Sequence, residues 1–137
     1  MLFRSDDRRD LLDLQLTWAL TSTLSTAFNV DLGRDANAKW GGIAVYIRKN
    51  VGDRFSPTLR AESYSDPQGF TTGVAQHVVD FTLTGDTRVG GKTSFAKLLL
   101  RPEVRYDRSD APFFTDHDRF RAQKDQWTAA FAAVVWF

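Results

Sequence analysis

Two histidines are the residues of this sequence best suited to bind a metal ion or move a proton at neutral pH. His117 lies between Asp116 and Asp118, whereas His77 lies in an apolar segment. Imidazole and carboxylate groups can bind divalent ions, but residues adjacent in a chain rarely converge on one ion. We therefore expect a solvated loop around His117, an interfacial or loop position for His77, and no metal site.

Other chemical motifs are also incomplete. The aspartates in loop-like segments do not have the spacing of a calcium-binding EF-hand loop. The segment VGGKTS (Val89–Ser94) resembles a phosphate-binding loop, but its glycine spacing is wrong by one residue and a strand-like segment follows it. No serine, histidine and aspartate are arranged as nucleophile and base. The sequence therefore predicts no cofactor, no catalytic residue and no enzymatic activity.

Charged residues instead alternate with apolar ones, two positions apart. Arg60 and Glu62 form one such pair, and Arg101, Glu103, Arg105 and Asp107 form a longer series. Residues two apart on a strand point to the same side of a sheet. These segments therefore predict rows of opposite charge, which suit a water-filled channel or the wet face of a soluble sheet.

Length and composition narrow the possible classes of protein. The 137 residues suffice for one domain, and 18 Lys and Arg against 17 Asp and Glu give a net charge of +1, which argues against nucleic-acid binding. Cysteine is absent, so disulfides and thiolate metal sites are excluded. The longest apolar run, Ala129–Phe137, is too short for a membrane-spanning helix. A membrane β-barrel remains open, because its strands need only about 10 alternating residues.

Seven segments alternate between apolar and polar residues, as half-buried strands do. They are Leu12–Leu20, Thr26–Asp35, Lys39–Lys49, Phe55–Tyr64, Gln76–Thr84, Thr93–Asp107 and Trp127–Phe137. The predicted connections alternate between short and long, with long loops at Gly33–Lys39, Ser65–Ala75 and Arg108–Gln126, and a short turn at Gly85–Lys92. This pattern is typical of an antiparallel up-and-down (meander) transmembrane β-barrel, so we predict an all-β fold of this kind.

Alternation alone does not decide which face meets water. In a soluble antiparallel barrel or meander, Leu12, Leu14 and Leu16 would point inward and could bind a small apolar ligand or a protein partner. In a membrane barrel they would face lipid. Aromatic residues near the strand ends suit a lipid–water interface and favour the membrane interpretation. These residues are Trp18, Trp40, Phe55, Tyr64, Tyr106, Trp127, Trp136 and Phe137.

Several longer motifs resemble one known family. The segment Trp40–Gly73, with R-x-E followed by DP-x-GF, and the segment Leu98–Asp110, with LRPE-x-RYD, resemble the outer-membrane β-barrel porins of the porin-2, OmpL-like family. The resemblance extends over residues 10–137 and includes the C-terminal aromatic Phe137. It implies a channel for passive diffusion of small polar solutes in the outer membrane of a Gram-negative bacterium.

The resemblance also implies positions and partners. The residues expected to line the pore are Asn29, Asp31, Arg48, Arg60, Glu62, Asp80, Arg101, Glu103, Arg105 and Asp107. The expected partners are the lipid bilayer, lipopolysaccharide and the barrel assembly machinery, which would read the last strand up to Phe137; no nucleic acid is expected.

The number of predicted strands bears on the extent of the barrel. Residues 1–9 are expected to form a charged N-terminal loop segment, and residues 10–137 the strands. Seven is an odd number, whereas single-chain bacterial barrels have an even number of strands. We therefore expect the C-terminal part of a larger barrel, completed by N-terminal strands or by other copies.

Overall fold

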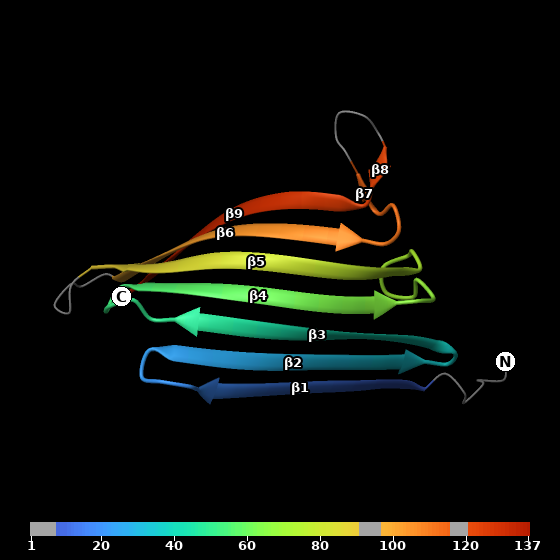
Figure 1. Cartoon of the computed structure of the whole chain (residues 1–137), viewed down its shortest axis with the longest axis horizontal. Helices are drawn as coiled ribbons and strands as arrows, with labels where there is room; N and C mark the ends of the chain where they lie inside the picture. The colour runs from blue at the N-terminus through green and yellow to red at the C-terminus, as the bar shows by residue number, and fades with distance from the viewer. Residues whose placement is uncertain (1–7, 91–96, 116–120) are drawn as a thin grey trace.

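Seven long antiparallel strands form one sheet, in which each strand pairs with the next along the chain (Figure 1). The computed structural model describes residues 8–90, 97–115 and 121–137. The strands are β1 (Arg9–Ala19), β2 (Leu24–Asp35), β3 (Ala38–Lys49), β4 (Phe55–Asp66), β5 (Gln76–Val89), β6 (Lys97–Ser109) and β9 (Asp125–Trp136). The predicted all-β antiparallel meander is confirmed. Among the residues that the structure describes, no helix is long and apolar enough to cross a membrane.

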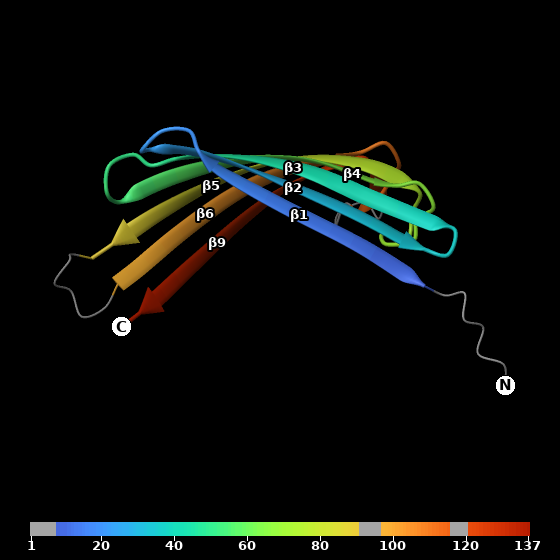
Figure 2. The same cartoon turned by 90° about the horizontal axis from the view of Figure 1, so that it is seen from below.

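The sheet is twisted and arched, and it stays open (Figure 2). The strand order begins at β1 and ends at β9, and no pairing between these two closes the sheet into a barrel. Both edge strands are exposed along their whole length. They therefore present unpaired backbone groups, which is the usual liability of a sheet edge.

The connection between β2 and β3 is much shorter than the sequence predicted. The long loop predicted at Gly33–Lys39 is wrong, because pairing continues to Asp35 and Ala38 and leaves a two-residue turn. Ala36 in this turn has φ of 48°, the positive value that tight hairpin turns require. Gly33 lies inside β2 because the indole ring of Trp40 covers it, and a Cβ atom there would collide with that ring.

Strand β5 is longer than predicted. The turn predicted at Gly85–Lys92 is wrong at its start, because β5 continues through Asp86 to Val89. Gly85 lies between two close neighbours: an added Cβ atom would be 3.4 Å from the ring of Phe55 and 3.6 Å from Pro102. Residues 91–96 lie outside the described part of the chain.

The last connection is long, as predicted, and contains a small hairpin. Strands β7 (Phe114–Thr115) and β8 (Ala122–Gln123) pair with each other between β6 and β9. Pro57, which cannot donate a hydrogen bond to a neighbouring strand, is the third residue of β4 and so lies near its start. The long connections after β4 and β6 meet at the right-hand end of the sheet in Figure 1, opposite the shorter turn after β3.

Candidate functional site

The ten residues predicted to line a pore lie on one face of the sheet. Pairing places Asn29, Ala44, Glu62, Asp80 and Asp107 side by side across five strands, and alternation brings the others to the same side. We call this the polar face, and the opposite side the outer face. The register thus brings together the full predicted set.

The two faces differ in exposure. On the polar face of β5, Asp80 is 3% exposed and Asp86 is 5% exposed, whereas Phe81 and Leu83 on the outer face are 51% and 55% exposed. Curvature crowds side chains on the inner side of a sheet and spreads them on the outer side. The polar face is therefore the concave side of the arch in Figure 2.

Five charged residues on three strands form a central cluster on the polar face. The carboxylate of Asp80 in β5 forms salt bridges with two arginines: it lies 3.3 Å from Arg60 Nη1 and 3.6 Å from Arg105 Nη2. Arg60 also contacts Glu62, and Arg105 Nη2 lies 2.6 Å from Asp107. Each buried carboxylate therefore has a cationic partner, which a charge removed from water requires.

Neutral residues extend the central cluster to the neighbouring strands. Gln126 of β9 donates a hydrogen bond of 3.0 Å to Asp107. On the other side, the guanidinium group of Arg60 lies 5.8 Å from the ring centre of Tyr46 in β3. The polar network thus reaches from β3 to β9.

A second group, the Asp86 cluster, joins three strands nearer the β3–β4 turn. Asp86 accepts two hydrogen bonds from Arg101, at 2.6 Å from Nε and 3.0 Å from Nη2, and one of 3.0 Å from Arg48 Nη1. Sequence reasoning missed Asp86 because Gly85 suggested a turn. The alternation of Thr82, Thr84 and Asp86 was the signal that could have found it.

Three predicted residues lie outside both clusters. Glu103 accepts a hydrogen bond of 2.8 Å from Thr84, and Asn29 donates one of 2.9 Å to Asp13 of β1. Asp31 is exposed and faces Asp13 directly across the strand pair. Among the described residues its side chain forms no salt bridge.

The loop between β4 and β5 folds onto the polar face. Asp66, at the end of β4, is fully buried and accepts hydrogen bonds from the backbone amides of Phe70, Thr71 and Thr72 at 2.8–2.9 Å. Burial tends to raise the pKa of Asp66, but these hydrogen bonds outweigh it and lower the pKa to about 2. The carboxylate therefore holds the start of the loop in one conformation.

Aromatic stacking ties the tip of this loop to the first strands. Phe70 stacks on Trp40 of β3 with 4.9 Å between ring centres, and the guanidinium group of Arg9 of β1 lies 5.4 Å from the Phe70 ring. Arg9 in turn pairs with Asp35 at 2.7 Å. The loop thus reaches from β4 across to β1. The sequence predicted a long loop here but not these contacts, because nothing in the segment indicates its long-range partners.

Among the described residues, no metal-binding group is found around the residues considered for metal chemistry. In the described part of the chain, no group of three or more His, Asp or Glu side chains could hold a metal ion. His77 Nε2 lies 2.9 Å from Ser63 Oγ, and His117 lies outside the described residues. Of the VGGKTS segment only Val89 and Gly90 are described.

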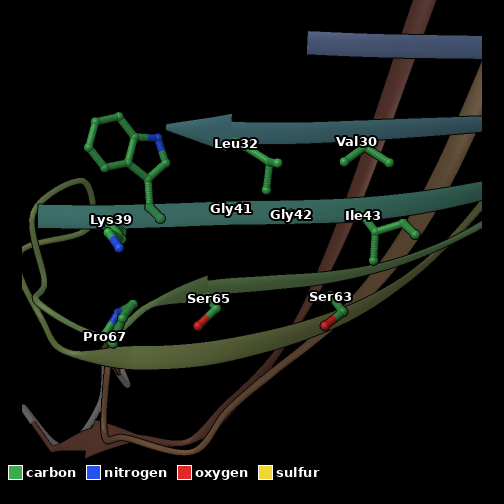
Figure 3. A pocket seen from close by; sticks show the side chains of 10 residues that line it. Val30, Leu32, Lys39, Gly41, Gly42, Ile43, Ser63, Ser65 and Pro67 are labelled. Carbon is green, nitrogen blue, oxygen red and sulfur yellow. The ribbon is translucent and has the colours of Figure 1, made fainter. Parts of the chain in front are cut away.

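The outer face is mainly apolar, and a shallow hollow lies on it (Figure 3). The hollow has a volume of about 430 Å³ and lies over Gly41, whose missing side chain leaves space on this face of β3. Its walls are Val30 and Leu32 on one side and Ser63 on the other. It contains no charge cluster and is separate from the polar face.

Comparison with known proteins agrees with this geometry. A family model described as "Putative beta-barrel porin-2, OmpL-like" matches residues 3–137. No curated protein and no solved structure matches the chain significantly. The matched range includes all seven long strands and the ion-paired polar face. The chain therefore belongs to the porin-2, OmpL-like family of β-barrel porins.

Proposed function

We propose that this chain forms part of the wall of an outer-membrane channel for passive diffusion of small polar solutes. The observation that carries the proposal is the inverted exposure of the two faces. Ion pairs with buried carboxylates occupy the concave side, whereas the large apolar side chains lie exposed on the convex side. In a barrel wall, such an arrangement directs apolar residues to lipid and charged residues to water.

The open edges support a wall rather than a finished barrel. Unpaired backbone groups of β1 and β9 would each cost several kcal/mol in hydrocarbon. Both edges must therefore be paired in the membrane, either with each other or with further strands from the same polypeptide or from other copies. The seven strands contribute the section of wall that carries the central cluster and the Asp86 cluster.

A soluble antiparallel barrel that binds an apolar ligand is the competing function. It requires the face with Leu12, Leu14 and Leu16 to be interior, but these three residues are 58%, 48% and 43% exposed. On the inner strands, Ile47 and Leu59 of the same face are exposed as well. The geometry therefore favours the channel.

The test uses protein extracted from the native membranes. The chain is expected in the detergent-extracted outer-membrane fraction, and the extracted material should increase the swelling rate of liposomes in isotonic solutions of small sugars and amino acids. Liposomes prepared with a mock extract serve as the control. Recovery of the chain as a soluble monomer without detergent, or swelling equal to the control, would contradict the proposal.

A further inference from the structure

Basic and acidic residues of the polar face are separated along the direction of the strands. Residues directly opposite one another across neighbouring strands form rows, and six consecutive rows contain charged residues. The four rows nearer the β3–β4 turn contain Arg48, Arg54, Arg60, Arg88, Arg101 and Arg105, with Asp86 and Glu103. The next two rows contain Asp13, Asp31, Glu62, Asp80 and Asp107; among the described residues their one basic member is Lys124, whose carbonyl oxygen accepts a hydrogen bond from the backbone N–H of Ser109.

The arginines next to the acidic rows are neutralised by ion pairs. The arginines nearer the β3–β4 turn, at the basic end of the polar face, keep an excess of positive charge. Arg60 and Arg105 pair with the first acidic row through Asp80. Arg48 and Arg101 share the single carboxylate of Asp86. One carboxylate cannot neutralise two guanidinium groups, so this cluster retains positive charge.

Two further arginines increase the excess of positive charge at the same end of the polar face, near the β3–β4 turn. Arg88 donates its backbone N–H to the carbonyl oxygen of Arg54 at 2.8 Å, so the two residues are neighbours across β4 and β5. Both are exposed, and neither forms a salt bridge within the described ranges. Like charges directly opposite each other on a sheet destabilise it. This position therefore favours a bound anion.

Space for a small solute exists beside these arginines. A hollow of about 430 Å³ lies at this end of the sheet. The basic residues Arg54, Arg88 and Lys97 line part of it, together with Trp136 and one acidic residue, Asp53. Arg48 and Arg101 keep 34% and 47% of their side chains exposed although they bind Asp86. Each guanidinium group has five N–H donors in a planar fork that matches carboxylate and phosphate oxygens.

We infer that the basic end of the polar face is a binding site for small anionic solutes that carry phosphate or carboxylate groups. Arg54 and Arg88 bind the anion. Arg48 and Arg101 add to the positive electrostatic potential at the site, and the negative charge of Asp86 weakens binding enough for the solute to leave. Conduction requires such a balance between binding and release. The inference rests on the proposed channel, because the site lies on the face assigned to the lumen.

The test measures binding separately from transport. The full chain, folded in detergent micelles, is titrated with inorganic pyrophosphate by calorimetry at low salt. Replacing both neighbours, Arg54→Gln with Arg88→Gln, should weaken binding at least about tenfold, since each lost charge-assisted hydrogen bond is worth a factor of this size. The charge-retaining pair Arg54→Lys with Arg88→Lys should lose less affinity than the double Gln variant, because it keeps both positive charges although it loses the planar fork of donors.

Two further variants complete the design. Asp86→Asn should tighten pyrophosphate binding about tenfold, because it removes the one carboxylate shared by two arginines. The matched control, Arg34→Gln with Arg108→Gln, removes two exposed arginines far from this site and should change affinity less than about twofold. If the double Gln variant misfolds, as judged by its gel mobility with and without heating, Arg88→Gln alone gives the same comparison.

The outcomes separate the site from the channel. Absent pyrophosphate binding, or equal losses in the control and the Arg54 and Arg88 variants, would overturn the anion site even if liposomes swell. Binding that follows the expected order in micelles, with no swelling activity, would support the site and contradict the channel.

Discussion

Asp80 holds two arginines at once at the centre of the polar face. Its carboxylate is almost fully buried and contacts both Arg60 and Arg105. Removing one partner of a buried ion pair leaves the other charge uncompensated, which is far more costly than losing an exposed pair. The stability of the wall therefore depends strongly on this residue.

Replacement of Asp80 gives the first prediction. Asp80→Asn should lower the free energy of unfolding by about 3 kcal/mol, because both arginines lose their shared charged partner. Glu103→Gln is the matched control, since Glu103 accepts a hydrogen bond from the neutral hydroxyl of Thr84; its effect should stay below about 1 kcal/mol. Urea unfolding in micelles measures both. Equal losses would show that Asp80 has no special structural role.

At the scale of single residues, strand alternation predicted which side chains share a face but not which ones touch. All ten pore-lining candidates lie on the polar face because a period of two leaves no other choice. The pairing of Asp80 with residues on two other strands depends on register, which local sequence does not specify. Asp86 was missed for a different reason: a glycine inside a strand has the same local appearance as a glycine in a turn.

The loop between β4 and β5 is the element whose conformation depends most on ionisation. The pKa of Asp66 is about 2 in the folded protein and 3.8 without its partners. The folded pKa is the lower one, so Asp66 stabilises the loop above about pH 4, and this contribution is lost as the pH falls from about 4 toward 2.

The second prediction follows from this shift. In a ¹³C NMR titration of the protein in micelles, the Asp66 carboxyl signal should change with a midpoint near 2, and the amides of Phe70, Thr71 and Thr72 should shift with it. An Asp66→Asn variant should show no such coupled change in these amides. A midpoint near 3.8 would contradict the buried, hydrogen-bonded position of Asp66.

The third prediction concerns the aromatic contact of the same loop. Phe70→Ala should free the loop from Trp40 and Arg9, because it removes both the stacked ring and the cation–π partner. Proteolysis within residues 67–75 should become at least several-fold faster. Phe113→Ala is the control, since Phe113 packs on Phe114 in another connection. Equal cleavage rates in the native protein and Phe70→Ala would show that the stack does not hold the loop.

Element boundaries were predictable where polar turns interrupt alternation and failed where small residues lie inside strands. Gly33 lies in β2 because the Trp40 ring needs the space above it, and Gly85 lies in β5 close to Phe55 and Pro102. Both reasons involve a neighbouring strand. A sequence read locally therefore assigned these glycines to connections.

At the scale of the whole molecule, the outer face must meet lipid if the chain forms part of a channel wall. Leu83→Arg places a charge on this face and should cost about 2–4 kcal/mol in the membrane, and so greatly reduce assembly. The matched control is Thr84→Arg, one residue later on the polar face, where the new guanidinium group can pair with Glu103. This fourth prediction is measured as the heat-modifiable, folded fraction in outer membranes. Similar loss in both variants would contradict the assignment of faces.

The assignment of faces is tested most directly by spin labelling, which the absence of cysteine in the chain makes straightforward. Single cysteines replace Leu59 and Leu83, which are opposite each other on the outer face, or Thr58 and Thr84, which are opposite each other on the polar face. In reconstituted bilayers, labels at Leu59 and Leu83 should be relaxed by oxygen, and labels at Thr58 and Thr84 by a water-soluble nickel complex. Nickel access at the two leucine positions with oxygen access at the two threonine positions would contradict the account.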